Sequence, residues 1–420
     1  MIRMFTRRCL AAGLAAATLL GATRVAAQQP DAIEEGTRAA EIAAQQAQKA
    51  QNPPPYKENK VEQFLNEFEE SFVRGQVSWH PWFESAYAGG SFTLGAGWAK
   101  HVSPYNVIDF RGSYTILGYK RLEAEFLAPR IFDRHGSFSV IGGWREATEV
   151  GFYGFGTGNT SKDDRANYSF SQPYLQAVLD YWPTRRFLVL TAGLEYTQWD
   201  QSDSDKDPSV EEVYTPETLP GLNASPTYLH THGRVGFDWR RGQSTEIPEL
   251  GGAAGYARSG GYYGVTVHSF ADQDDDYSFR QVDYEAIQHL PILRDAWVLS
   301  LHGRVQTTYD VDDQIIPFFM MPALGGGSSL RGFSSWRFRD RHSLLLTAEW
   351  RVLVNRFLDM ALFYDAGKVT ARRSDLDFDS LKSDFGLGFR LHGPAVTPLR
   401  IELAKSNEGL QIVFSAKAAF

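Results

Sequence analysis

The chain has 420 residues, a formal net charge of −8, 14% aromatic residues and 38 glycines. An acidic balance argues against nucleic-acid binding, which depends on a basic face. No stretch after the N-terminal segment reaches the ~18 consecutive apolar residues of a membrane helix. A soluble all-β protein and an outer-membrane β-barrel are therefore the two classes that remain.

Residues 1–27 predict a secretory signal peptide. Three arginines precede the apolar run CLAAGLAAATLLGA, and VAA before Gln28 supplies small residues at the cleavage positions. The pair Arg7 and Arg8 also allows twin-arginine export, which is the lesser alternative. The segment holds four arginines, no acids and the only cysteine, Cys9, so its removal takes the net charge to −12 and leaves no thiol for disulfides.

Residues 28–76 predict a periplasmic linker followed by an amphipathic helix. The Ala- and Gln-rich stretch after the signal ends at NPPPY, which no helix crosses. In the predicted helix at 57–72, apolar residues recur at i, i+3, i+4 and i+7, namely Val61, Phe64, Leu65, Phe68 and Phe72. This stripe could plug the barrel, lie across its periplasmic mouth, or bind a periplasmic partner.

From about residue 77 onward the apolar residues recur at every second position. In 342–354, for example, one face carries Leu344, Leu346, Ala348 and Trp350, and the other carries Thr347, Glu349 and Arg351. Many such segments reach the ~9–11 residues needed to cross a bilayer. We count about sixteen strands, at 77–87, 91–103, 105–116, 118–131, 136–149, 167–182, 185–200, 226–240, 260–272, 277–290, 296–310, 342–354, 357–369, 381–393, 398–406 and 410–420.

The connections between these strands alternate in length. Four long gaps, at 150–166, 201–225, 311–341 and 370–380, follow odd-numbered strands, and gaps after even-numbered strands are short, with 241–259 as the exception. Short turns on one rim and long loops on the other are typical of outer-membrane barrels. Lipid offers an edge strand no hydrogen-bond partner, so such a sheet must close on itself. We predict a closed antiparallel transmembrane β-barrel over 77–420, monomeric, in the outer membrane of a Gram-negative cell.

Alternation by itself also fits a soluble sandwich, which stays as the alternative fold. Five tryptophans near the predicted strand ends favour the barrel, since interfacial belts are rich in aromatic residues. They are Trp79, Trp82, Trp182, Trp199 and Trp239. The acidic stretch 201–212 is predicted to be a solvent-exposed loop.

An ordered set of motifs resembles the BamA/TamA superfamily of outer-membrane assembly and secretion barrels, the bacterial surface antigen type. That family carries an Arg-Gly-aromatic motif in the long loop between strands eleven and twelve, and SSLRGF at 328–333 falls in the same connection here. FYDAG at 363–367 matches the family's Phe-x-Asp-x-Gly motif on strand thirteen. The stretches FYGFGTG, AEWRVLV and DWRR…ARSGGYYGV also resemble family segments, and the resemblance covers about 77–420.

The resemblance and the alternation together predict a site in the barrel lumen. Arg331, Gly332 and Phe333 form the loop motif, and the lumen-facing partners are Glu349, Arg351, Phe363, Asp365 and Gly367. We expect Arg331 to enter the lumen and pair with Asp365, and additionally with Glu349. Gly367 would leave room for the loop backbone, and Phe333 would pack on the inner wall. The alternative is that Arg331 is a solvated surface charge.

The resemblance implies insertion or translocation of proteins, or of lipid, through a barrel wall with a weak seam. Its partners would be outer-membrane lipids and unfolded outer-membrane or secreted proteins. Family members carry periplasmic substrate-receiving modules, which the helical segment 28–76 does not resemble. Ala416 and Ala418 in the last strand could thin the closing seam. A passive pore or structural barrel without assembly activity is the alternative function.

Enzymatic chemistry is not predicted. GGGSSLRG lacks the second glycine of a G-x-S-x-G elbow, so Ser328 and Ser329 are interpreted as loop residues. The ten histidines show neither an H-E-x-x-H motif nor cysteine partners for zinc. The sequence therefore predicts no catalytic residue, no cofactor and no metal, with a phospholipase-like enzyme as the least favoured alternative.

Overall fold

The computed structural model describes Glu41 and residues 78–158, 161–184, 187–241, 257–293, 296–355, 358–391 and 399–415. The chain divides into Met1–Leu65 and Asn66–Phe420, and the second unit contains the fold described below. The predicted signal peptide, linker and helix, and the predicted thin seam at Ala416 and Ala418, lie outside the described residues. Among those residues, no helix has the length and apolarity to cross a membrane.

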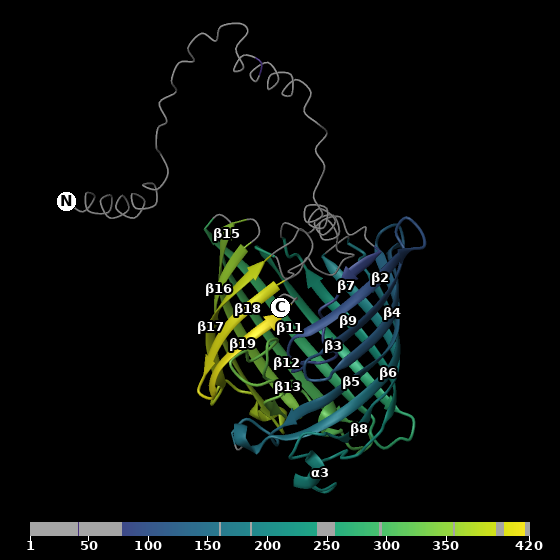
Figure 1. The fold of residues 1–420 in the computed structure, drawn as a ribbon, viewed down its shortest axis with the longest axis vertical. Coiled ribbons are helices and arrows are strands. Elements are labelled where there is room, and N and C mark those ends of the chain that lie inside the picture. Colours follow the sequence, from purple (N-terminus) through teal and green to yellow (C-terminus); the bar gives the residue numbers. More distant parts are fainter. Residues whose placement is uncertain are drawn as a thin grey trace, which may run out of the picture. The chain divides into compact units, whose positions relative to one another are not determined.

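Sixteen strands within the described residues follow one another as an antiparallel meander that curls into a barrel (Figure 1). Each pairs with the next, and the short β8 (Asp200–Asp203) extends the β7 edge along β6. The strands are β1 (Trp79–Pro81), β2 (Thr93–His101), β3 (Val107–Thr115), β4 (Lys120–Ile131), β5 (Gly136–Phe152), β6 (Ala166–Tyr181), β7 (Leu188–Gln198), β9 (Thr227–Asp238), β10 (Gly260–Asp272), β11 (Phe279–Leu293), β12 (Trp297–Asp310), β15 (His342–Asn355), β16 (Leu358–Thr370), β17 (Lys382–Leu391), β18 (Leu399–Ser406) and β19 (Gly409–Ser415). The predicted barrel class and strand number are confirmed.

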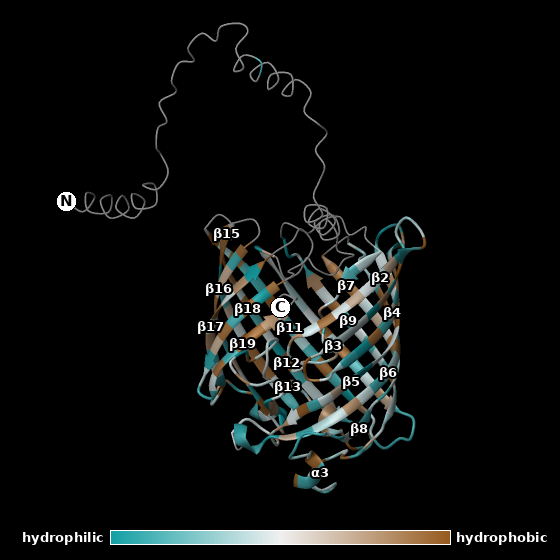
Figure 2. Cartoon of the chain, viewed as in Figure 1, coloured by the Kyte–Doolittle hydropathy of each residue, from teal (hydrophilic) through white to brown (hydrophobic). Residues whose placement is uncertain are grey.

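The two faces of the sheet differ as the alternation predicts. On β16, Leu362 and Tyr364 are 56% and 51% exposed on the outside, whereas Phe363 and Asp365 between them are buried inside. Hydrophobic and hydrophilic residues alternate along the strands in Figure 2. Because an apolar exterior and a polar interior suit a wall in contact with lipid, the surface is that of a membrane barrel.

The first strand is much shorter than the predicted 77–87. β1 ends at Pro81, and the next residue, Trp82, turns its ring into the barrel, where it is 8% exposed. The guanidinium groups of Arg111 and Arg121 lie 5.2 and 4.9 Å from the ring centroid. Two cation–π contacts inside the barrel are favourable for this ring, so the assignment of Trp82 to an interfacial belt was wrong.

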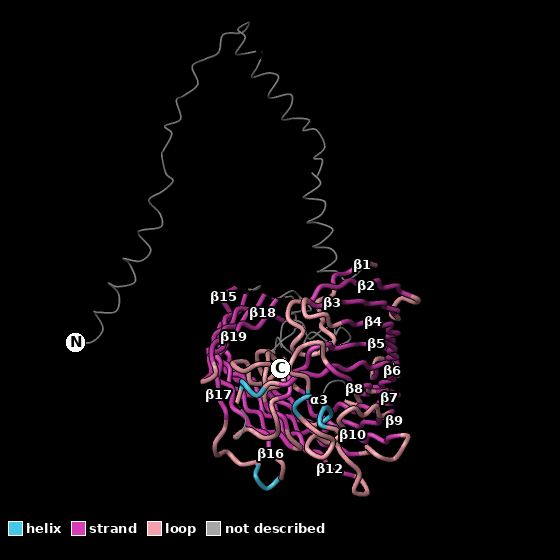
Figure 3. The backbone as a smooth tube through the Cα atoms, turned by 60° about the horizontal axis from the view of Figure 1, so that its bottom comes forward, coloured by secondary structure: helices cyan, strands magenta, loops and turns pink. Residues whose placement is uncertain are grey.

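The long connections gather at one end of the barrel, which we call the loop rim (Figure 3). They carry η1 (Lys162–Asp164), α3 (Val210–Val213), η4 (Phe318–Met320) and η5 (Arg373–Asp375). Beneath them lies an aromatic core that includes Phe152, Tyr168, Phe170, Phe318 and Phe319. Trp199 packs against this core and not in a belt. Within the predicted exposed loop 201–212, residues 205–208 are exposed as expected. The two ends instead belong to β8 and α3, and Val210 buries its side chain in the same core.

One contact in this region predicts a dependence on pH. A hydrogen bond with Asp203, together with partial burial, raises the pKa of Glu211 from 4.5 to about 7. Since the folded-state pKa lies above the ordinary value, the shared proton stabilises the contact between α3 and β8 at low pH, and this contribution is lost as the pH rises through about 7. Amide exchange in α3, corrected for intrinsic rates, should be slower at about pH 5 than at about pH 8. Glu211→Gln should abolish the difference; equal protection at both pH values in the unaltered protein would contradict it.

Candidate functional site

The connection from β12 to β15 folds back into the barrel through a small hairpin of its own. β13 (Ala323–Leu324) pairs with β14 (Phe338–Arg339), and residues 325–337 between them form a compact loop. Gly325 and Gly326 have φ of 117° and 89°, a left-handed region that favours glycine. The Gly326 amide donates to the carbonyls of Leu330 and Phe333, which fixes the backbone on both sides of Arg331.

Arg331 lies 2% exposed inside the barrel, bonded to carboxylates from three strands. Its Nε and Nη2 donate to Oδ2 and Oδ1 of Asp365 on β16, both at 2.7 Å. Its Nη1 donates to Glu349 Oε1 on β15 at 2.6 Å and to Glu402 Oε1 on β18 at 3.1 Å. Burial lowers the pKa of Arg331, but the surrounding carboxylates outweigh it and raise the pKa above its ordinary value. The bidentate fork on Asp365 fixes the loop in one position.

An aromatic face completes the Arg331 pocket. The Cζ atom of Arg331 lies 3.5 Å from the ring centroid of Phe363, a cation–π contact in a water-poor environment. Gly386 on β17 makes room for this ring, because a Cβ there would lie 2.4 Å from its Cζ atom. Phe363 therefore orients the guanidinium plane and shields it on one side.

Arg390 and Glu402 belong to the same network, although no motif in the sequence marked them as partners of Arg331. Arg390 on β17 donates to both oxygens of Glu349, at 3.0 and 2.7 Å, and to Glu402 at 2.9 Å. Glu402 thus bridges Arg331 and Arg390. Both residues lie on the polar faces of strands predicted from alternation, which was the available signal. Lacking a motif, neither could be distinguished from any other lumenal charge.

The loop motif is pressed against the barrel wall next to Arg331. A Cβ on Gly332 would lie 2.5 Å from the Cβ of Asp384, and the Gly332 carbonyl accepts from Ser406 Oγ at 2.7 Å. Phe333 is buried in a cluster with Leu324, Leu330, Phe338, Leu345 and Val369. Only glycine fits at position 332, so the backbone itself makes the contact.

Two predicted partners have surroundings different from those expected. Gly367 faces the side chains of Leu324 and Leu330, and not the loop backbone that we expected there. Arg351 donates to the carbonyl of Ala257 and to His289 Nδ1, contacts made away from Arg331. The structure thus brings Arg331 together with Asp365, Glu349 and Phe363, whereas Arg351 links β15 to the segment before β10.

The protein is thus a sixteen-stranded membrane barrel with an inward-folded loop. This loop places a buried arginine among carboxylates of the lumen. The chain belongs to the Omp85 superfamily: the model of the Omp85 superfamily domain matches residues 108–415. Membership agrees with the predicted BamA/TamA-type resemblance and locates the barrel in the Gram-negative outer membrane.

Solved structures show the same fold at low sequence identity. BamA from Haemophilus ducreyi lacking POTRA domains 1–3 is 14% identical with a TM-score of 0.56, covering 81% of this chain and 69% of that chain. CdiB from Escherichia coli is 11% identical with a TM-score of 0.50, covering 78% of this chain and 59% of that chain. This chain therefore spans less than two thirds of CdiB. No curated protein matches the sequence.

Proposed function

We propose that this barrel inserts or translocates proteins, or lipid, at the outer membrane. The observation that carries the proposal is the inserted loop, whose Arg331 binds carboxylates of β15, β16 and β18 at once. Membership of the Omp85 superfamily supports it.

The loop gives the proposal a physical basis because it braces one part of the wall. Arg390 joins β17 to the same network, and Gly327 lies against Val413 of β19, where a Cβ would approach to 2.6 Å. The strands from β15 to β19 are thus tied to one rigid loop. We infer that a client strand would enter the wall beyond β19, which lies outside this braced block.

A passive pore or a structural barrel is the competing function. A polar lumen is compatible with solute passage. The aromatic core at the loop rim argues against solute passage. The ring centroid of Phe318 lies 5.2 Å from that of Phe152 and 4.9 Å from that of Tyr168. A tightly packed core of this kind leaves little space for a solute in this region.

Reconstitution separates the two functions. Lipid vesicles containing the purified protein should accelerate the folding of a urea-unfolded eight-stranded outer-membrane barrel, followed by its gel shift, relative to vesicles containing a porin at equal mass. Conductance of small solutes without any acceleration, combined with normal levels of other barrels in depleted cells, would support the passive pore and reject the assembly role.

We further propose that residues 28–76 are periplasmic and that the predicted helix 57–72 binds a partner there. Its apolar stripe would be unstable in water without a covering surface. Photo-cross-linking from Phe64 or Phe68 in intact cells would identify the contact, and products confined to the barrel itself would indicate a plug.

A further inference from the structure

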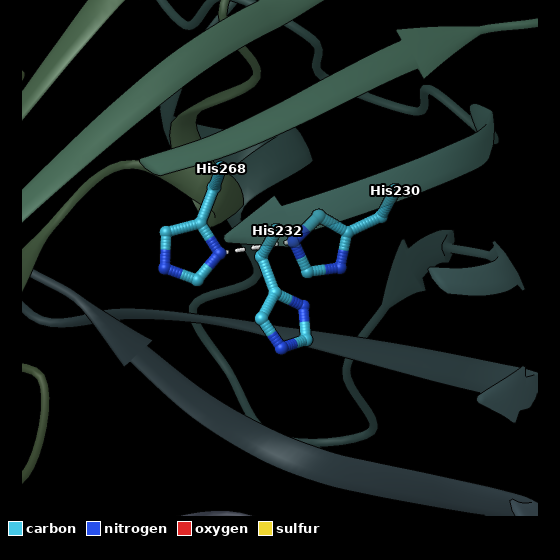
Figure 4. A group of neighbouring side chains, drawn as sticks. All are labelled: His230, His232 and His268. Carbon is cyan, nitrogen blue, oxygen red and sulfur yellow. Dashed lines mark hydrogen bonds between the residues drawn. The ribbon is translucent and has the colours of Figure 1, made fainter. Parts of the chain in front are cut away.

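Three histidines from two neighbouring strands converge in the barrel lumen (Figure 4). His230 and His232 are alternate residues of β9, and His268 is the register partner of His232 on β10. One ring nitrogen from each histidine lies within 4.8 Å of the other two. Their ring centroids form a nearly equilateral triangle with sides of 5.4, 5.3 and 5.6 Å.

The hydrogen bonds fix the tautomer of His230. Its Nδ1 lies 3.1 Å from Glu195 Oε2 on β7, so Nδ1 carries the proton and Nε2 presents a lone pair. That Nε2 atom accepts a hydrogen bond of 3.0 Å from Nδ1–H of His268, so a metal ion bound between the two atoms would displace this proton to solvent. A carboxylate that orients a histidine in this way is the usual outer partner of a metal-bound imidazole.

His232 is held close to His230 and His268. A Cβ on Gly193 would lie 2.0 Å from the His232 ring, so this position on β7 accommodates the imidazole only as glycine. Nδ1 of His232 is buried and has no hydrogen-bond partner. A buried polar atom without a partner requires an explanation, and an ion at this place would supply one.

Aromatic stacking holds the His230 ring in place. The His230 ring stacks on Phe270, with centroids 4.0 Å apart and an interplanar angle of 2°, and Phe270 stacks on Phe279 at 4.5 Å. Side chains with locked rotamers lose little entropy when they bind an ion.

We propose that His230, His232 and His268 bind a divalent transition-metal ion, Zn²⁺ or an ion of similar ligand preference, in the barrel lumen. Tetrahedral Zn²⁺ places nitrogen ligands about 3.3 Å apart, a spacing within reach of the present arrangement. Three imidazoles leave a fourth position for water. Mg²⁺ and Ca²⁺ would not compete, because they prefer oxygen ligands.

Zinc titration of the untagged, folded protein in detergent tests the site. We expect one Zn²⁺ per chain with micromolar or tighter affinity, and Co²⁺ bound in its place should show the visible absorption of a tetrahedral complex. His268→Asn or His232→Asn should abolish this absorption and weaken Zn²⁺ binding about tenfold or more, and Glu195→Gln should weaken it roughly 10–100-fold.

The matched control is His302→Asn. His302 is also a lumenal histidine bonded to a glutamate, with Nε2 3.0 Å from Glu285 Oε1, but it lies on β12 outside the cluster. The control should bind Zn²⁺ as the unaltered protein does, and the gel shift on heating shows that each variant is folded. No binding by the folded protein, or equal binding by the unaltered protein, His268→Asn and His232→Asn, would overturn the site. Neither result bears on the assembly role.

Discussion

Asp365→Asn is expected to destabilise the folded barrel by about 3–5 kcal/mol, because it leaves the buried Arg331 without its bidentate partner. Asp365 is 0% exposed and receives two hydrogen bonds of 2.7 Å from the guanidinium. Asn keeps the shape of the side chain but presents an amide N–H₂ to a donor. Glu349 and Glu402 would retain the remaining contacts, so the loss should fall short of complete unfolding.

The measurement is the midpoint of the heat-induced transition in detergent, followed by circular dichroism and by the gel shift of the folded barrel. Asp275→Asn in the exposed turn after β10 is the matched control, and its midpoint should not move. The double variant Arg331→Met with Asp365→Asn should lose much less than the sum of the single losses, because both changes remove one interaction. An unchanged midpoint for Asp365→Asn would disprove the stabilising role of the pair.

Gly332→Ala is expected to destabilise the seated loop by about 1–3 kcal/mol through overpacking. The added Cβ would lie 2.5 Å from the Cβ of Asp384 and 3.1 Å from that of Ser406, both anchored directly to the barrel wall. Gly332 has no positive φ, so alanine is compatible with its backbone and the effect comes from the contact alone. The loop must shift away from β17 and β18, which weakens the Arg331 network as well.

Limited proteolysis at the loop, together with the thermal midpoint, reports this change. The variant should be cleaved faster between 325 and 337 and should unfold earlier. Gly158→Ala serves as control, because a Cβ there would meet nothing within 4 Å. Should both variants behave like the unaltered protein, the close seating of the loop against Asp384 is refuted.

The alternation of apolar and polar residues determined most of the fold without any tertiary information. A period of two gives each strand an apolar and a polar face, and the long connections separate the two rims, so strand number, class and the lumenal position of Asp365 followed from local patterns. The first strand and stretch 201–212 were predicted less well. There Trp82 and Val210 bury their side chains in neighbours that are remote in sequence.

The sequence by itself thus established which side chains face the lumen, and a motif indicated that Arg331 would meet Asp365 there. Only the tertiary structure decided which lumenal residues touch. Glu402 lies 71 residues from Arg331, and His268 lies 38 residues from His230. Alternation specifies a face but carries no information on height along the barrel, which depends on the register between strands. Register is set by pairing of whole strands, so the contacts appear only once the sheet has formed.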